Sequence, residues 1–185
     1  MKNALLIDLG GTNIRYAFFI KNTLLEISKE KIADKDFISF LTKLLEGKKD
    51  EIDYLVIAAA GPNNQKFINL TNRDLLIDAS ELKTQLDLKE CLLLNDWEAV
   101  AQSLSELNQE CFLPIKSGTA SGENTILIGP GTGLGVTLII KGQIIPTEFG
   151  NTFSPTKSML ENFDIQDNKT FFSLENILSG PGIEK

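Results

Sequence analysis

The chain has 185 residues, of which 42% are hydrophobic and 23% are charged, so it can bury the core of one domain or of two small ones. Its formal net charge of -7 argues against nonspecific nucleic-acid binding, which depends on an excess of basic residues, and against anchoring on anionic membranes. The sequence contains no histidine, which excludes a histidine general base, a Ser-His-Asp triad and every histidine-ligated metal site.

The use of cysteine and the apolar runs indicate where the protein works. Cys91 and Cys111 lie far apart and outside any metal-binding spacing, as is usual in a reducing cytoplasm. Asp8 interrupts the first apolar run, so no N-terminal signal is expected, and no run reaches the roughly 18 apolar residues of a membrane span. We therefore expect a cytoplasmic protein with no membrane partner and with Cys91 in its core.

The first part of the chain predicts three successive strands, over residues 4–9, 14–20 and 24–32. Residues 10–13 (GGTN) form a hairpin signal between the first two strands, and residues 21–22 join the second strand to the third.

The middle of the chain alternates helices with buried strands. Residues 54–60 form a continuous apolar run, which is typical of a central strand covered on both faces. In chain order we expect a helix between an N-cap at Asp36 and a stop at Gly47, the strand 54–60, a short helix from Asp78 or Ser80 to Leu86, a strand over 91–94 and a helix from Asp96. This order predicts a mixed α/β sheet with helices on its faces.

Residues 114–124 are rich in Gly, Ser and Thr and mark a candidate domain boundary, so we expect domains at 1–113 and 114–185. After this boundary the pattern restarts with a strand at 125–128, a glycine-rich turn at 129–133 and strands at 134–140 and 143–145. The order of strand, glycine turn and strand repeats the opening of the chain and suggests two structurally related units.

Each of the two glycine-rich turns follows an apolar run. Glycine has no Cβ, so bare backbone amides can approach a ligand, and converging amides form anion sites. Neither turn is followed by the Gly-Lys-Ser/Thr of a Walker motif, and neither leads from a strand into a helix as in a Rossmann fold. Two such turns suit the polyphosphate of a nucleotide.

Several acidic and amide side chains follow strands, and each has two interpretations. Asp8 either caps its own turn or is a partner of Mg²⁺, direct or through water, beside a bound phosphate. Asp96 either is the N-cap of a helix or acts as a general base at the carboxyl end of a central strand. Asn72, Glu148 and Glu175 are either solvated polar groups or partners of vicinal sugar hydroxyls.

Seven segments, taken in order, resemble the bacterial glucokinase family within the superfamily of sugar kinases, actin and Hsp70 ATPases. The zinc motif of a related group of repressors and kinases, which is rich in cysteine, does not occur in this sequence. The matching segments are 6–15 (LIDLGGTNIR), 59–62 (AAGP), 70–72 (LTN), 94–101 (LNDWEAVA), 129–136 (GPGTGLGV), 146–148 (PTE) and 178–182 (LSGPG).

The resemblance implies an α/β fold: a ribonuclease H-like (actin-like ATPase) mixed-sheet domain followed by an incomplete second domain of the same type. It also implies transfer of a phosphoryl group from ATP to the 6-hydroxyl of glucose, with Asp96 as the general base and Mg²⁺ near Asp8. The site residues expected on this basis are Asn72, Asn95, Asp96, Glu148, Asn151 and Glu175 for the sugar, and Asp8, Gly10, Gly11, Thr12, Asn13, Gly131, Thr132 and Gly133 for the nucleotide.

The sequence departs from the family in two ways. Phe149 and Asn151 stand where the family has a second glycine and a histidine. Family members also continue well beyond residue 185, and that remainder supplies the adenine-binding segment, so weak ATP affinity is expected. Three hypotheses follow: a glucose kinase, a non-catalytic sugar-binding remnant, or an assembly module completed by another chain or by a homodimer.

Overall fold

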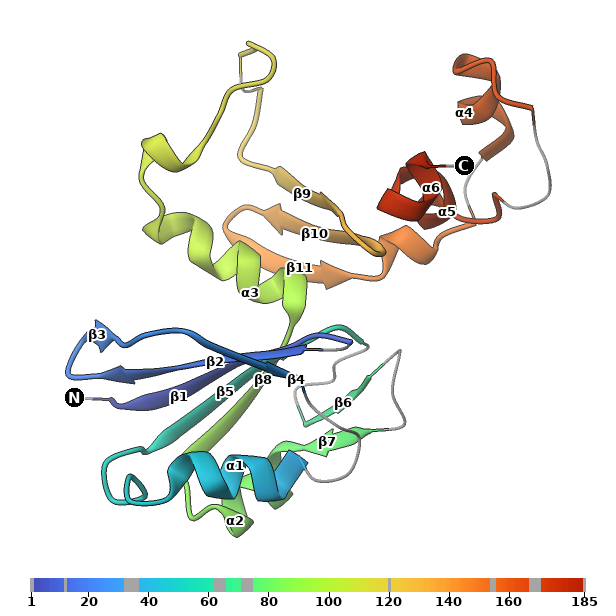
Figure 1. The fold of residues 1–185 in the computed structure, drawn as a ribbon. Helices are drawn as coiled ribbons and strands as arrows, with labels where there is room; N and C mark the ends of the chain where they lie inside the picture. Colours follow the sequence, from blue (N-terminus) through green and yellow to red (C-terminus); the bar gives the residue numbers. More distant parts are fainter. Residues whose placement is uncertain are drawn as a thin grey trace. The chain divides into compact units, whose positions relative to one another are not determined.

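The computed structural model describes residues 2–11, 13–31, 37–61, 66–70, 75–119, 121–153, 156–166 and 171–184. The chain divides into a first unit, Met1–Ala99, and a second unit, Val100–Lys185 (Figure 1). The sequence-based boundary between residues 113 and 114 lies further along the chain and stays a prediction. Asp36, the expected N-cap of the first helix, lies outside the described residues.

The first unit is built around a mixed sheet. Its elements are β1 (Ala4–Leu9), β2 (Asn13–Ile20), β3 (Thr23–Leu24), β4 (Ser28–Lys31), α1 (Phe37–Leu45), β5 (Tyr54–Ala59), β6 (Phe67–Asn69), β7 (Leu76–Asp78), α2 (Ala79–Gln85) and β8 (Glu90–Asn95), and α3 (Asp96–Ser103) continues into the second unit. The strand order is β3-β2-β1-β5-β8, with β4 also paired to β2 and with β6 and β7 paired separately. β1 is antiparallel to β2 and parallel to β5, and β5 is parallel to β8.

One face of this sheet carries the core. Leu5, Leu55 and Cys91 are aligned across the three parallel strands, and all three are buried. They share one apolar cluster with side chains of α1 and α2, which lie on the same side of the sheet (Figure 1). Alternate residues of β5 are only partly buried, and Leu92 on β8 is 49% exposed. We expected the strand over residues 54–60 to be covered on both faces. Within this unit that expectation is wrong for the face of the sheet turned away from α1 and α2.

The strand predicted over residues 24–32 is interrupted. Leu24 pairs with Phe19, whereas Ser28 pairs with Tyr16, so β3 and β4 lie along β2 in registers that differ by one residue. The extra residue produces a β-bulge at 25–27, which the pattern of apolar and polar residues over 24–32 did not reveal. The turn at residues 21–22 is confirmed, since both residues have positive φ as a tight hairpin requires.

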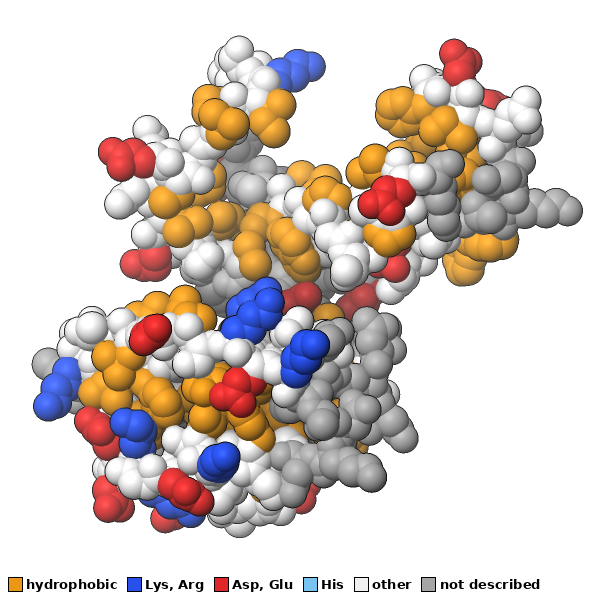
Figure 2. All heavy atoms as spheres, in the orientation of Figure 1, with side chains coloured by type: hydrophobic (Ala, Val, Ile, Leu, Met, Phe, Trp, Pro, Cys, Tyr) orange, Lys and Arg blue, Asp and Glu red, His pale blue; other side chains and the backbone are white. Residues whose placement is uncertain are grey.

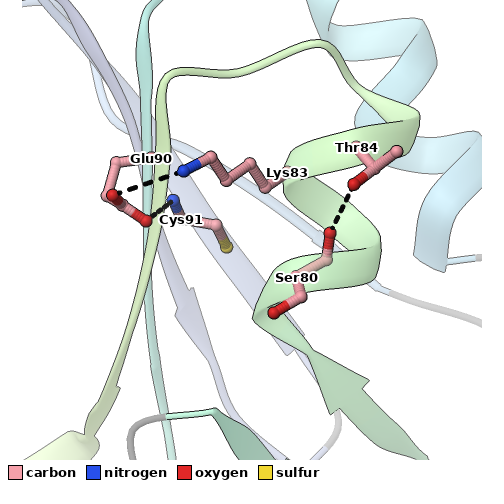
Figure 3. Close-up of polar contacts among 5 residues, drawn as sticks. All are labelled: Ser80, Lys83, Thr84, Glu90 and Cys91. Atoms are coloured by element: carbon pink, nitrogen blue, oxygen red, sulfur yellow. Dashed lines mark hydrogen bonds and ion pairs between the residues drawn. The ribbon is translucent and has the colours of Figure 1, made fainter.

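One ion pair joins helix α2 to β8, beside the buried thiol of Cys91 (Figure 3). Lys83 Nζ lies 3.5 Å from Glu90 Oε2, and Glu90 Oε1 accepts a hydrogen bond from the Cys91 amide at 3.3 Å. Within the helix, the Thr84 hydroxyl donates to the Ser80 carbonyl. Burial raises the pKa of the Cys91 thiol to about 12, so this cysteine is an inert core residue, as the sequence predicted.

The second unit contains an antiparallel meander of strand order β11-β10-β9. Leu134 and Val136 on β10 are buried, whereas Ile126 and Ile128 on β9 are more than half exposed. Figure 2 shows exposed hydrophobic side chains on this unit. Its elements are η1 (Leu104–Glu106), η2 (Gln109–Cys111), β9 (Thr125–Pro130), β10 (Leu134–Ile140), β11 (Gln143–Thr147), η3 (Phe149–Asn151), α4 (Thr156–Asn162), α5 (Leu174–Leu178) and α6 (Gly180–Ile183).

In the part of the chain that the structure describes, every helix is too short or too polar to cross a bilayer.

Candidate active site

The carboxyl ends of the parallel strands bring two of the predicted acidic residues to one edge of the first sheet. Leu9, Ala59 and Asn95 are aligned across β1, β5 and β8. Asp8 precedes the first of these residues and Asp96 follows the last, so both carboxylates lie at the sheet edge where open α/β sheets bind ligands.

The first glycine turn (residues 10–13) closes the hairpin between β1 and β2. The Gly10 amide donates to the Asn13 carbonyl at 2.9 Å, and a Cβ at Gly10 would lie 3.3 Å from that oxygen. The predicted hairpin is confirmed, and Gly11 at its tip is exposed. Thr12 lies outside the described residues.

Asp8 forms an ion pair that the sequence did not reveal. Arg15 Nη1 donates to Asp8 Oδ2 at 2.7 Å, with the two side chains 51% and 48% exposed. The two residues face each other across the hairpin, because they are equally far from the centre of the turn. That symmetry about the turn is the signal that could have identified Arg15.

Asn95, rather than Asp96, caps α3. Asn95 is 6% exposed, and its Oδ1 accepts hydrogen bonds from the amides of Trp97 at 2.9 Å and Glu98 at 3.3 Å. Glu98 Oε2 accepts in return from the Asn95 amide at 3.2 Å, which completes a capping box. The interpretation of Asp96 as the N-cap is therefore wrong. The spacing of Asn95 and Glu98 was the signal in the sequence.

Asp96 is a half-buried carboxylate whose Oδ1 accepts the Trp97 amide at 2.9 Å. Burial raises the pKa of this carboxyl above its ordinary value. The hydrogen bond from Trp97 opposes this effect, and the charge of Asp8 adds to it. Asp8 and Asp96 are thus electrostatic neighbours within the first unit.

The second glycine turn (residues 131–133) joins β9 to β10. β9 runs two residues further than predicted, because Gly129 and Pro130 pair with Gly135 and Leu134. The Gly131 amide donates to the Gly133 carbonyl at 2.9 Å. Glu175 Oε2 accepts a hydrogen bond from the Leu134 amide at 2.9 Å, so the structure brings Glu175 to this turn.

Glu148 and Asn151 lie together after β11 in the second unit. Asn151 Nδ2 donates to Glu148 Oε2 at 3.4 Å across the turn of η3, and both residues are exposed. Asn72, the remaining residue predicted to bind sugar, lies outside the described residues. Among the residues that are described, no group of three or more acidic, cysteine or histidine side chains could hold a metal ion.

Solved sugar kinases share this fold. A glucokinase from an Antarctic psychrotroph superposes with a TM-score of 0.74 at 24% identity, covering 99% of this chain and 62% of that one. The glucokinase of Balamuthia mandrillaris, solved in complex with glucose, gives a TM-score of 0.68 at 23% identity and covers 98% and 60% of the two chains. The predicted α/β fold of the actin-like ATPase class is therefore confirmed.

The chain belongs to the glucokinase family, whose model matches residues 5–185. It is 30% identical over 193 residues to a glucokinase-like protein of Xylella fastidiosa, which covers 95% of this chain and 58% of that protein. It is 31% identical over 190 residues to the glucokinase of Photorhabdus laumondii, which covers 97% and 59%. The chain thus spans somewhat more than half the length of these relatives.

Proposed function

We propose that the chain carries the catalytic base and the phosphate-binding turns of an ATP-dependent glucose kinase that works in the cytoplasm. The observation that carries this proposal is the Asp96 carboxylate at the carboxyl end of β8, where burial and Asp8 raise its pKa. A higher pKa makes a carboxylate a stronger proton acceptor, provided that it is ionised at the working pH. Membership of the glucokinase family supports the choice of reaction.

In the proposed step, Asp96 takes the proton of the sugar 6-hydroxyl while that oxygen forms a bond to the γ-phosphorus of ATP. The bond from the γ-phosphorus to the bridging oxygen breaks, and ADP leaves. The hydrogen bond from the Trp97 amide to Oδ1 orients the carboxylate.

The two glycine turns would hold the phosphates of the nucleotide. Asp8 would hold Mg²⁺ through water, and the ion would offset the charge of the phosphates when bound. Magnesium typically takes one or two protein carboxylates together with phosphate oxygens and waters, and the half-exposed Asp8 carboxylate fits this donor set. Arg15 holds the Asp8 carboxylate at the edge of the hairpin.

The sugar would meet carboxylate and amide groups, namely Asn72, Asn95, Glu148, Asn151 and Glu175. The Oδ1 atom of Asn95 already accepts two backbone amides, so its Nδ2 is the group that would donate to a hydroxyl. A site that pairs with hydroxyls in this way rejects analogues that lack them. The glucose in the structure of the Balamuthia mandrillaris enzyme supports a hexose as substrate.

A second candidate is an assembly module whose second unit is completed by another polypeptide. The exposed Ile126 and Ile128 on β9 favour it, because large apolar patches mark interaction surfaces.

The test is a coupled assay of ADP release with glucose and several other hexoses, together with calorimetric titration of each sugar. We expect turnover by the parent chain, loss of turnover with retained glucose binding for Asp96→Asn, and parent behaviour for the control Asp87→Asn. Asp87 has a positive φ that asparagine tolerates, so the control should fold. Normal turnover by Asp96→Asn would contradict the role of the base. Glucose binding without turnover of any hexose would favour a binding remnant, and turnover only with an added polypeptide would favour the assembly module.

A further inference from the structure

The second glycine turn is tied at both ends to one short segment near the end of the chain. The Leu134 amide, at the exit of the turn, donates to Glu175 Oε2 at 2.9 Å. The Gly180 amide donates to the Gly131 carbonyl, at the entry of the turn, at 2.8 Å. The segment of α5 and α6 therefore fixes the conformation of the turn from the side, although Leu134 and Glu175 are 41 residues apart in the sequence.

Gly133 makes room for the Glu175 carboxylate. A Cβ at this position would lie 2.6 Å from Glu175 Oε2, closer than a carbon and an oxygen approach without displacement. The backbone of Gly133 does not have the positive φ that would by itself favour glycine. Contact with the carboxylate is thus a reason for glycine at the third position of the turn.

The short helix α5, which carries Glu175, is itself held in place by a capping box and by apolar packing. Ser173 and Asn176 form a capping box at the start of α5, in which the Asn176 amide donates to the Ser173 hydroxyl and the Ser173 amide donates to Asn176 Oδ1. On the same short helix, Ile177 is buried in a cluster with Leu160 and Phe171. The carboxylate therefore reaches the turn from an element with its own cap and its own apolar anchor.

We infer that Glu175 is a positioning residue that braces the second glycine turn and couples this turn to the bound sugar. The inference rests on the proposed function, in which Glu175 meets the sugar and the turn meets a phosphate. Oε2 accepts the hydrogen bond from the Leu134 amide, so Oε1 is the oxygen that would accept a hydrogen bond from a sugar hydroxyl. A hydroxyl bound at Oε1 restrains the carboxylate and thereby the turn. Sugar and polyphosphate then each increase the affinity for the other, as linkage requires.

The brace is tested by hydrogen exchange of the Leu134 amide in the full chain, measured by NMR. Loss of a hydrogen bond to a charged acceptor should raise the exchange rate about tenfold or more in Glu175→Ala. Glu175→Gln keeps an acceptor and should raise it less than about threefold, and Glu161→Gln on the exposed face of α4 should leave it unchanged. Amides of the β9–β10 ladder report whether each variant is folded. If Glu175→Ala does not fold, Gly133→Ala, which displaces the carboxylate, should give the same increase. An exchange rate equal to that of Glu161→Gln would overturn the brace.

The coupling is tested with glucose and with magnesium tripolyphosphate, a probe of the phosphate turn that needs no purine site. In the parent chain, saturating glucose should slow exchange at Leu134 and tighten tripolyphosphate binding in calorimetry, and both effects should disappear in Glu175→Ala. Glucose that binds without either effect overturns the coupling. If glucose does not bind but Glu175→Ala still accelerates exchange at Leu134, the brace stands, whereas the sugar kinase function and the coupling both fail.

Discussion

Replacing Asn95 with alanine removes the side-chain cap of α3. The Trp97 amide keeps a second acceptor, Asp96 Oδ1 at 2.9 Å, whereas the Glu98 amide loses the 3.3 Å hydrogen bond to Asn95. Deleting an N-cap typically costs about 0.5–2 kcal/mol. Because one of the two amides keeps a partner, we expect the free energy of unfolding to fall by about 1 kcal/mol, in the middle of that range.

Asn95→Ser is the matched control, since serine also caps helices well. We expect its free energy of unfolding to stay within about 0.5 kcal/mol of the parent chain. The assay is unfolding in urea followed by fluorescence, because the sequence contains a single tryptophan and Trp97 lies in the first turn of α3. Equal midpoints for Asn95→Ala and Asn95→Ser, at unchanged slope, would refute the cap.

The same pair of variants separates capping from ligand binding. Serine restores an acceptor for the helix amides but lacks the Nδ2 donor that would meet a sugar hydroxyl. We therefore expect Asn95→Ser to keep its stability and to bind glucose more weakly. If Asn95→Ser binds glucose as tightly as the parent chain does, Asn95 does not contact the sugar.

Asp96→Asn should raise the free energy of unfolding at neutral pH, because burial and Asp8 raise the pKa of the Asp96 carboxyl, so that its ionised form destabilises the folded chain. Below the ordinary pKa of 3.8 the carboxyl is protonated in both the folded and the unfolded chain, so the gain should vanish. Denaturation at one pH on each side of this value measures the difference. Gly150→Ala should lower the free energy of unfolding by about 1–3 kcal/mol in thermal denaturation, since its Cβ would overlap a backbone carbonyl of β10. Gly122→Ala is the control, and it should lower this free energy by less than about 0.5 kcal/mol because the space around Gly122 is open. Arg15→Gln should change the free energy of unfolding by less than about 1 kcal/mol, because half-exposed ion pairs such as that with Asp8 contribute little, and a loss above about 2 kcal/mol in urea denaturation would contradict this view.

Apolar runs predicted most strands of the two larger sheets, because burial on a sheet selects short blocks of Leu, Ile and Val. β1, β5 and β8 match the expected 4–9, 54–60 and 91–94 to within one residue at either end. The break between β3 and β4 could not be predicted, since a bulge depends on the register with β2 rather than on the composition of the strand itself.

In the candidate site too, features that depend on neighbouring residues could be predicted from the sequence, whereas contacts between distant residues could not. Parallel pairing made it foreseeable that Asp8 and Asp96 would share a sheet edge. The spacing of Asn95 and Glu98 indicated the capping box, but Asp96 is also a good capping residue at the same junction. The hydrogen bond from the Leu134 amide to Glu175 had no local signal, because it depends on how α5 packs beside β10.

The separation in sequence between paired strands also bears on the order in which the two larger sheets form. β1 pairs with β5, so Ala4 meets Tyr54 only after a long loop has closed, whereas β9, β10 and β11 pair with their neighbours along the chain. Sheets built from local contacts assemble faster than those built from distant ones. We expect the β9–β10–β11 meander to gain protection in pulsed hydrogen exchange before β5 does, because both partners of β5, namely β1 and β8, are distant in the sequence. During synthesis β1 can pair with β2 at once, whereas its other edge stays unpaired until β5 (Tyr54–Ala59) has also emerged.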